Sequence, residues 1–488
     1  MPLILGTNSI KDTGYEVANS CRFNIADSAY LTTKTNGSEP TLGTKYTISV
    51  WLKRSTLVNS SYQYIISHDG GSNPRTHIRF NDDADNLTWY IRDSGGTASS
   101  LVPSMLFRDI NAFYHLVFAY DSTQASASNR QKIYVNGTQI TSFSTSGYVA
   151  QDVVNPFSAN GNASKIASFG GTASDYYGGY MSEFVFVDGQ ALTPTSFGEF
   201  SEDSPNIWMP KDVSGLTFGT NGYYLDFEDS ANLGNDANGG TDFTENNLAA
   251  TDQCLDTPTN NYAVPNILLQ GVSMTYNENN LEIIISGTAQ YGTQSSIGMT
   301  AGKWYCELKH TANTSAGNDR VMVGIVGNPT HLALQGSGAG TEGYVGASSE
   351  PTSYGYYGDT GSSYQNSSAT SYGDTWTIND IIGIYLDCDN NKLYFSKNGT
   401  VQNSGTGISI TDPASTVAGA YFFAFTDTSS YGGTVQVNFG GASCYTISSA
   451  VADANGYGSF EYSPSGTFDS ASKDFLALCT KNLGSDGG

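Results

Sequence analysis

Positive charge is scarce in this sequence. Its 488 residues include 21 lysines and arginines against 45 aspartates and glutamates, which gives a formal net charge of -24. Because nucleic-acid binding depends on cationic side chains that neutralise phosphates, this composition argues against a nucleic-acid partner. Long apolar runs are also missing. No run approaches the roughly 20 residues that a membrane-spanning helix needs, so we expect no membrane span.

Cysteine and histidine are few and widely spaced. The six cysteines form no C-x-x-C pair, and the five histidines have no metal-ligand spacing. Cys306 and Cys388 lie in strand-like segments, where buried free thiols are the favoured interpretation and a disulfide is the alternative. We also expect no signal peptide. The N-terminal apolar run covers only residues 2–5, whereas a signal core needs about 7–15 residues.

Glycine and aromatic residues are abundant by contrast. The chain has 55 glycines and 32 tyrosines, and Asn-Gly and Asp-Gly pairs recur along it. These pairs supply the positive φ angles that tight hairpin turns require. Short segments with alternating apolar side chains lie between them, as in KYTISVWLKR at residues 45–54, and no segment keeps a helical period. The richness in aromatic residues excludes a disordered chain. The sequence therefore predicts an all-β protein.

The strand-like segments form two groups. We expect one β-sandwich at residues 13–200 and a second at residues 266–440, joined by a semi-ordered connector at residues 201–265. Residues 1–12 are a candidate N-terminal docking arm. Residues 441–488 are a Gly/Ser-rich C-terminal segment and a second candidate for docking.

The first group contains four segments in a recognisable order. They are YTISVWLKR (46–54), AFYHLVFAYD (112–121), KIYVNGTQI (132–140) and GGYMSEFVFVDGQAL (178–192). In this order they resemble the laminin G-like, concanavalin A-like jelly roll. The resemblance implies a lectin-like β-sandwich.

The second group resembles a different sandwich. Its segments are GKWYCELKH (302–310), RVMVGIVG (320–327), NDIIGIYLDCDNNKLYFSKNGT (379–400) and VQVNFG (435–440). Together they resemble the SPRY domain of the B30.2 class, and the third segment reproduces that family's pattern nearly in full. This resemblance implies a second jelly-roll, concanavalin A-like sandwich.

The combination of the two sandwiches with the connector resembles virion-associated proteins of marine tailed phages. The resemblance implies a non-enzymatic component of the particle surface that assembles with other virion proteins and attaches to the host surface, with host-surface glycan as a candidate partner. It also explains an extracellular composition without a signal peptide, since lysis releases assembled particles. We expect a homo-oligomer, with a trimer as the first choice. The position on the particle stays open between tail fibre, tail tip and head decoration.

Two alternatives to a purely structural role are a calcium-dependent glycan-binding adhesin and a polysaccharide depolymerase. A depolymerase needs two carboxyl groups about 5 Å apart. Asp226 and Glu228 are predicted to share a strand face, but no third acid follows at alternating spacing. Asp387 and Asp389 fit a hairpin turn instead. The sequence therefore predicts no catalytic residues and no enzymatic activity.

Calcium is the one candidate cofactor. Asp82, Asp83 and Asp85 lie in the segment NDDADN, which concentrates the oxygen ligands that calcium prefers. The segment lacks the glycine and the distal glutamate of an EF-hand, and the alternative is a solvated acidic hairpin loop. Laminin G-like domains often hold calcium at a sandwich rim, but the resemblance carries no single ligand set over to these residues.

Tyrosines in two presumed loops are the candidate ligand-binding residues. The larger set is Tyr354, Tyr356, Tyr357 and Tyr364, and the smaller set is Tyr176 and Tyr177. Exposed tyrosines offer a large contact area at low entropic cost. The alternative is that these rings pack the loops onto the sandwich or face a neighbouring subunit.

Overall fold

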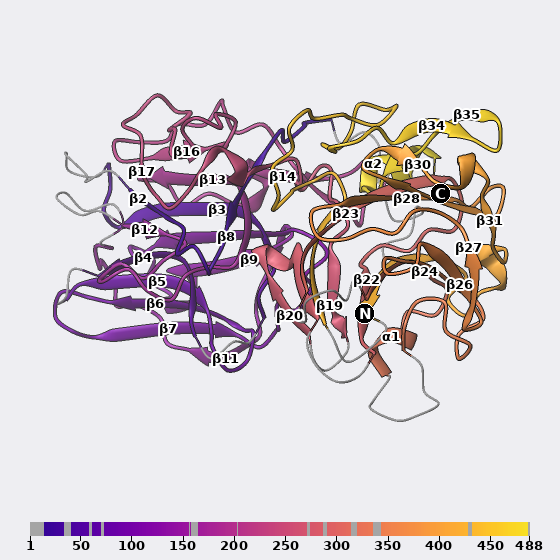
Figure 1. The fold of residues 1–488 in the computed structure, drawn as a ribbon. Coiled ribbons are helices and arrows are strands. Elements are labelled where there is room, and N and C mark those ends of the chain that lie inside the picture. The colour runs from indigo at the N-terminus through magenta and orange to yellow at the C-terminus, as the bar shows by residue number, and fades with distance from the viewer. Residues whose placement is uncertain are drawn as a thin grey trace. The chain divides into compact units, whose positions relative to one another are not determined.

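The computed structural model describes residues 14–33, 41–57, 61–69, 73–155, 157, 164–202, 204–270, 274–285, 290–313, 320–334, 343–427 and 432–486. The chain divides into two compact units, Thr13–Thr259 and a second one that includes Asn260–Gly488. Strands make up nearly all of the regular structure in both units (Figure 1). The predicted all-β fold with two β-sandwiches is therefore confirmed.

The first unit is a sandwich of two eight-stranded antiparallel sheets. One sheet has the order β10 (Thr138–Gln139), β9 (Gln131–Val135), β8 (Tyr114–Asp121), β3 (Lys45–Arg54), β13 (Gly179–Asp188), β1 (Ser20–Phe23) and β18 (Gln253–Cys254), with β16 (Tyr223–Leu225) paired to β13. The other has the order β11 (Phe143–Ser146), β7 (Ala98–Pro103), β6 (Leu87–Arg92), β5 (Arg75–Phe80), β4 (Gln63–Asp69), β12 (Lys165–Ile166), β2 (Tyr30–Thr32) and β17 (Thr244–Asn246). A ribbon of β14 (Gly198–Phe200) and β15 (Trp208–Pro210) completes the unit.

Apolar side chains alternate along β3, and those of one face enter the core as the sequence predicts. Tyr46, Ile48, Val50 and Leu52 are fully buried in the core between the two sheets. Trp51 lies on the opposite face, where its ring stacks on the His115 imidazole with a centroid separation of 4.5 Å. Both faces of β3 are therefore covered, which is why its polar residues are also buried.

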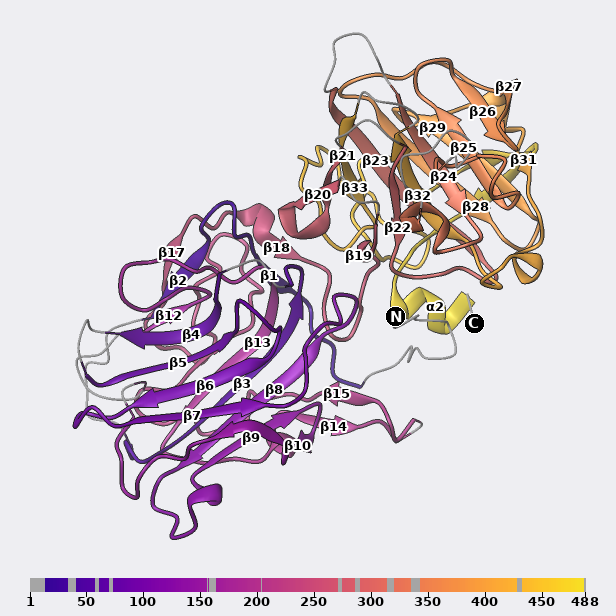
Figure 2. The same ribbon diagram turned by 90° about the horizontal axis from the view of Figure 1, so that it is seen from below.

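The second unit is also built from two sheets. The seven-stranded sheet has the order β19 (Pro265–Gln270), β22 (Gly292–Ser295), β32 (Phe422–Asp427), β24 (Val321–Val326), β25 (Ser353–Tyr357), β26 (Ser362–Gln365) and β27 (Ser368–Ser371). The nine-stranded sheet has the order β20 (Met274–Asn277), β21 (Glu282–Ile285), β33 (Gly433–Asn438), β23 (Lys303–Asn313), β28 (Ile381–Asp387), β29 (Lys392–Lys397) and β30 (Thr400–Val401), with β31 (Ile408–Ser409) paired to β29 and β36 (Leu476–Ala477) to β23. The second unit also contains the ribbon of β34 (Ser465–Phe468) and β35 (Ala471–Asp474) and the short helix α1 (His331–Leu334), which are labelled in Figure 1. A second short helix, α2 (Thr480–Asp486), lies at the C-terminal end of the chain (Figure 2).

The predicted connector differs from the structure. Residues 201–259 supply strands to both sheets of the first unit: β16 pairs with β13, β17 with β2 and β18 with β1. The interpretation of these residues as a semi-ordered connector was therefore wrong. The sequence pattern does not reveal the strands, because each is only two or three residues long and Asn- and Gly-rich turns separate them. Their stability comes from the sheets they join and not from their own propensity.

The C-terminal segment is likewise part of a fold. Strand β36 pairs in parallel with β23 in the second unit. Phe460, Phe468 and Phe475 are fully buried against Tyr305 and Tyr385. Glycine and serine dominate the composition of this segment, so the spacing of its phenylalanines gave no strand signal. The proposed docking arm at residues 1–12 lies outside the described residues.

Cys306 and Cys388 are buried free thiols, which agrees with the interpretation as small apolar side chains. Within the described part of the chain, no helix combines the length and the apolar character that crossing a membrane requires.

Candidate functional site

A turn between two neighbouring strands of the first unit positions the best candidate site. Strands β6 and β7 are joined at Asp93–Thr97, where the Asp93 Oδ1 atom accepts the backbone N–H of Thr97 at 2.8 Å. Gly96 has a φ of +89°, which a residue with a side chain rarely adopts. The Nε–H of Arg92 donates to the Gly96 carbonyl at 3.0 Å and holds the turn against its strand.

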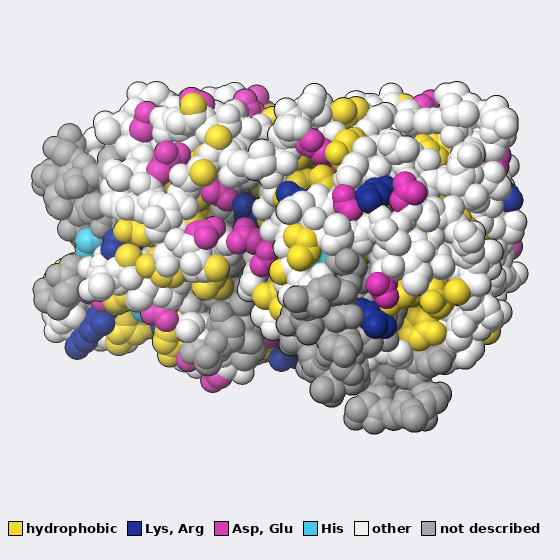
Figure 3. All heavy atoms as spheres, viewed as in Figure 1, with side chains coloured by type: hydrophobic (Ala, Val, Ile, Leu, Met, Phe, Trp, Pro, Cys, Tyr) yellow, Lys and Arg dark blue, Asp and Glu magenta, His cyan; other side chains and the backbone are white. Residues whose placement is uncertain are grey.

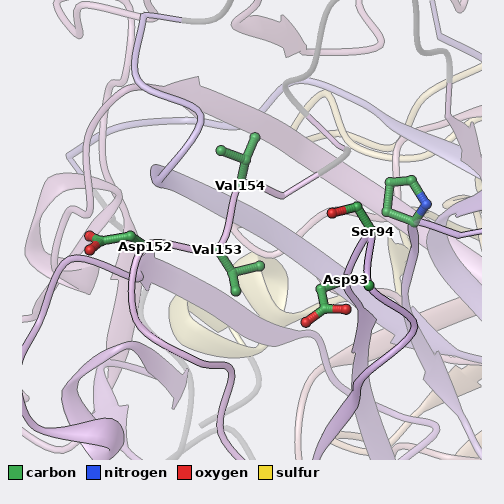
Figure 4. Close-up of a pocket in the computed structure, with 7 residues that line it drawn as sticks. Asp93, Ser94, Asp152, Val153 and Val154 are labelled. Carbon is green, nitrogen blue, oxygen red and sulfur yellow. The ribbon is translucent and has the colours of Figure 1, made fainter.

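A cavity of about 410 Å³ opens at this rim of the sandwich, and we refer to it as the rim pocket. It is lined by Pro74, Asp93, Ser94, Gly95, Asp152, Val153 and Val154. Asp152 lies on the far side of Val153 from Asp93, and Val154 and Ser94 lie above them in the view (Figure 4). Val154 is 53% exposed, although it is apolar.

The chemistry of the rim pocket suits a sugar. Carboxylate oxygens of Asp93 and Asp152 accept hydrogen bonds from hydroxyl groups. The apolar side chains of Pro74, Val153 and Val154 provide contacts for the C–H groups of a sugar ring. Pockets that combine an apolar lining with a few fixed polar groups are typical of small-ligand sites.

The ends of β5 and β6 reach the rim pocket, because Pro74 directly precedes β5 and Asp93 directly follows β6. The residues Arg75, His77 and Arg79 of β5 and Tyr90 and Arg92 of β6 alternate with the core residues and form the outer face of these strands. Arg75 lies directly opposite Arg92 in the register of these two strands. The next pair on this face is His77 and Tyr90, whose rings stack at 4.7 Å with an interplanar angle of 10°.

Arg79 continues the row on the same strand as Arg75. Its guanidinium carbon lies 3.4 Å from the centroid of the Tyr62 ring, and its Nη1 donates to the Tyr64 hydroxyl at 3.0 Å. Burial, together with the neighbouring Arg79 and Arg75, lowers the pKa of His77 to about 3. His77 is therefore neutral at physiological pH, and the positive charge of this face resides on its arginines.

The predicted calcium ligands do not form a site. Asp85 is 3% exposed, and its two carboxylate oxygens are bound by arginines: Oδ1 by Arg54 Nη1 at 3.0 Å and Oδ2 by Arg108 Nε at 3.2 Å. Asp82 is half-buried and Asp83 is exposed. Among the described residues, no group of three histidine, cysteine, aspartate or glutamate side chains could hold a metal ion. The prediction failed because Asp85 is turned inward to the guanidinium groups.

Four of the six candidate tyrosines are buried. Tyr354, Tyr356 and Tyr357 belong to strand β25 and are at most 5% exposed, and Tyr177 is fully buried. Their placement on exposed loops was wrong because β25 is covered on both faces. Tyr354 and Tyr356 face the main core, and Tyr357 faces a second apolar cluster. This outcome agrees with the alternative interpretation of these rings as packing residues.

The other two candidate tyrosines remain half-buried. Tyr364 packs edge-on against Tyr357 at 5.6 Å. Tyr176 donates from its hydroxyl to the Ala173 carbonyl at 3.1 Å. A role in ligand binding stays a prediction for these two residues only.

The acid pairs considered for catalysis have structural surroundings. Strand β16 ends at Leu225 and Phe227 has a φ of +60°, so Asp226 and Glu228 do not continue one strand face. The Asp226 Oδ1 atom instead accepts the backbone N–H of Glu228 at 3.1 Å.

The second acid pair makes the turn that the sequence predicts. Asp387 is fully buried and accepts the backbone N–H of Asn390 at 3.0 Å, and it also pairs with Lys473 at 3.0 Å. Asp389 pairs with Lys303 at 3.1 Å.

Sequence reasoning missed one unusual acid, Glu183 in β13. It is 5% exposed, and its Oε2 atom accepts the hydroxyls of Tyr224 at 2.8 Å and Tyr15 at 3.3 Å. Burial raises the pKa of Glu183 to about 8. An acid inside the apolar run GYMSEFVFVD was the available signal. The rim pocket was also missed, although a valine pair at 153–154 within a polar loop is a recognisable cue.

Comparison with protein families identifies both sandwiches. Residues 26–196 match the family model Laminin_G_3, described as the concanavalin A-like lectin/glucanases superfamily. Residues 303–442 match the SPRY domain. The chain therefore carries a laminin G-like, concanavalin A-like domain and a SPRY domain, as the two sequence resemblances implied. Among curated proteins, the search finds no match to this chain.

Solved structures show only distant similarity to the chain. The SPRY domain of human HERC1 has 15% identity and a TM-score of 0.28, over 37% of this chain and 99% of that one. A putative carbohydrate binding protein from Bacteroides ovatus has 19% identity and a TM-score of 0.33, over 48% of this chain and 59% of that one. A heptameric SAP-like pentraxin from Limulus polyphemus has 14% identity and a TM-score of 0.27, over 37% of this chain and 80% of that one. Similarity at this level carries no functional inference.

Proposed function

We propose that this protein is a non-enzymatic attachment protein that binds host-surface glycan with its laminin G-like sandwich. The observation that carries the proposal is the rim pocket, where two aspartates and exposed apolar side chains adjoin a row of arginines and aromatic rings. The two lectin-like folds provide rigid scaffolds for such a site.

The setting we propose is the surface of a tailed-phage virion, as a tail fibre or another particle-surface component. Support for it comes from the order of sequence segments and from the two β-sandwiches. In this setting the chain forms a homo-oligomer with other virion proteins as partners. An acidic surface on many crowded copies also opposes unwanted association between them.

The absence of catalysis is part of the proposal, and the surroundings of the acidic residues support it. Glu183 is protonated near neutral pH because burial raises its pKa to about 8, but it is 5% exposed and bonded to two tyrosine hydroxyls. Asp387 and Asp389 are engaged with lysines. None of these carboxyl groups lines the rim pocket, whose own acids are Asp93 and Asp152. The Asp93 Oδ1 atom accepts the backbone N–H of Thr97 and so belongs to the turn.

A glycan array with the full-length protein tests the binding function. Matched substitutions of exposed valines locate the site: Val154→Ser in the rim pocket and Val417→Ser in the second unit, where Val417 is 74% exposed. We expect Val154→Ser to weaken binding about fivefold, as expected for roughly 1 kcal/mol of lost contact, and Val417→Ser to have no effect. Equal effects of the two variants, or no binding to any glycan, would contradict the proposal.

Incubation of the protein with the polysaccharide it binds tests the absence of catalysis. We expect the chain length of the polysaccharide to stay unchanged over hours. Shortened chains would establish a depolymerase, and Glu183→Gln would then show whether the buried acid takes part.

A further inference from the structure

Two positive charges occupy directly opposite positions on the outer face of the first unit. Arg75 in β5 and Arg92 in β6 are register partners in an antiparallel pair. Like charges in this position repel one another and destabilise the pair of strands. The arrangement is notable in a chain with only 21 lysines and arginines in 488 residues. On the face of the molecule in Figure 3, lysine and arginine side chains are correspondingly sparse.

The surrounding groups compensate the two charges only in part. Asp69 Oδ2 lies 3.5 Å from Arg75 Nη1, at the edge of the row. Arg92 uses its Nε–H on the Gly96 carbonyl. No ion pair of Arg92 is found among the described residues, and the buried Nε atoms of Arg75 and Arg79 have no hydrogen-bond partner there.

The aromatic residues of the row add flat contact surfaces next to these charges. Tyr62 and Tyr90 are half-buried, so part of each ring faces solvent. Tyr90 rests on His77, and Tyr62 rests on Arg79. His77 is 8% exposed, and its Nε2 atom also has no hydrogen-bond partner among the described residues. Supported rings of this kind suit stacking against a flat ligand, since little side-chain entropy is lost on contact.

We propose that Arg75 and Arg92 together bind the carboxylate or sulfate group of an anionic saccharide whose sugar ring occupies the rim pocket. The guanidinium fork matches the geometry of such oxyanions and binds them with charge-assisted hydrogen bonds. A bound oxyanion would also turn the repulsion between the two arginines into a favourable interaction. This inference rests on the glycan-binding function proposed above and names the class of its ligand.

A saccharide fits the site better than a nucleic acid does. The arginine pair and the pocket are neighbours along both strands, because Pro74 directly precedes Arg75 and Asp93 directly follows Arg92. The Asp93 carboxylate accepts hydroxyl donors, which sugars carry in number, whereas the phosphodiester backbone of DNA offers it none. The net charge of -24 further opposes a long polyphosphate.

Titration calorimetry of the full-length protein tests the inference with four probes. Alginate oligosaccharide carries carboxylates, dextran sulfate oligosaccharide carries sulfates, neutral dextran carries neither, and single-stranded DNA carries phosphates. We expect alginate or dextran sulfate to bind, and the one that binds more tightly identifies the anionic group. We also expect this binding to weaken with added salt.

Single substitutions locate the site. Arg75→Gln and Arg92→Gln should each weaken binding of the anionic saccharide about tenfold or more. Lys132→Gln removes the same charge from β9 in the other sheet of this unit and should leave binding unchanged. A thermal melt of each variant should show a cooperative transition, so that the lost affinity is assigned to the lost charge and not to unfolding.

Four results would overturn the inference. Tight binding of DNA would indicate a general affinity for polyanions. Equal losses with Lys132→Gln and Arg92→Gln would remove the arginine pair as the site. Binding of neutral dextran alone would contradict the claim that the ligand is anionic but preserve the glycan-binding function. Failure of all three saccharides to bind would count against both the anionic ligand and the glycan-binding function.

Discussion

The ammonium group of Lys53 lies 2.8 Å from the Asp256 Oδ2 atom, and the two side chains are 1% and 2% exposed. Lys53 belongs to the central strand β3, whereas Asp256 lies near the end of the first unit. Ion pairs with so little exposure require a fixed protein environment, because each charge is costly to bury alone. Residues 201–259 are therefore integral to the laminin G-like sandwich, although the family match ends at residue 196.

Removing one partner of this pair should destabilise the first unit strongly. Asp256→Ala leaves the buried ammonium group of Lys53 without its carboxylate, and we expect a loss of about 3–5 kcal/mol in the free energy of unfolding. Calorimetric melting of the full chain measures the loss. Asp229→Asn, at an exposed position in the same segment, serves as the control and should change the stability by less than about 0.5 kcal/mol. A similar small effect for both variants would contradict the integral role of the segment.

Glu183 should make the stability of the first unit depend on pH. Burial raises its pKa from an ordinary 4.5 to about 8, so the folded state holds a proton that the unfolded state has lost between these values. Stability contributed by this group is therefore fully present below pH 4.5 and is lost as the pH rises toward 8. The loss amounts to at most about 1.4 kcal/mol per pH unit.

The variant Glu183→Gln isolates this effect. Its amide stays neutral, and its oxygen still accepts the hydroxyl of Tyr224, so we expect it to exceed the wild type in stability increasingly from pH 5 to pH 8. Denaturant unfolding at several pH values measures the difference. Glu202→Gln, at an exposed position, should show no such trend. Parallel curves for Glu183→Gln and the wild type would contradict the assignment.

Glu307 anchors the C-terminal segment to the second unit. The Tyr445 hydroxyl donates to its Oε2 atom at 2.8 Å, and the backbone N–H groups of Glu461 and Tyr462 donate at 3.0 and 2.7 Å. Burial raises the pKa of Glu307 above its ordinary value. These bonds tie three positions of the C-terminal segment to a single side chain in β23.

Loss of one of these bonds should be measurable. We expect Tyr445→Phe to lower the free energy of unfolding by about 1–3 kcal/mol, since a buried acceptor loses a donor. Tyr462→Phe is the matched control, because Tyr462 reaches Glu307 through its backbone and not through its hydroxyl. A larger effect for Tyr462→Phe than for Tyr445→Phe would rule out this anchoring scheme.

Calcium should not bind at the Asp82, Asp83 and Asp85 segment. The carboxylate of Asp85 is held by two guanidinium groups, so a calcium ion would have to displace Arg54 and Arg108. We expect the Tm of the protein to be the same in millimolar calcium and in excess EDTA. If calcium raises the Tm by several degrees and Asp85→Asn abolishes this rise, the ion displaces the arginines from Asp85 and the expectation is wrong.

Much of the fold follows from local sequence rules. The hairpin of β9 and β10 turns at Asn136 and Gly137, which both have positive φ values of 47° and 78°. This is the type I′ geometry that the Asn-Gly pair predicts. The alternation in β3 likewise predicts which of its residues enter the core.

The candidate site depended on information that a linear pattern lacks. The opposition of Arg75 and Arg92 follows from the register of two strands, which the separate segments RTHIRF and LTWYIR do not specify. Tyr354 and Tyr356 lie in a segment so rich in glycine and serine that it resembles a loop, yet pairing with β24 and β26 buries them. The pairing of strands therefore decides both the position of the two arginines and the burial of the two tyrosines.

The most direct test of glycan binding at the rim of the first unit is hydrogen–deuterium exchange of the full-length protein. The exchange is compared without ligand and with saturating alginate or dextran sulfate oligosaccharide. We expect the ligand that binds to slow exchange in peptides that cover residues 73–79, 90–97 and 151–155 and to leave exchange in the second unit unchanged. Protection confined to the SPRY domain, or saturating binding with no protection at these three segments, would contradict it.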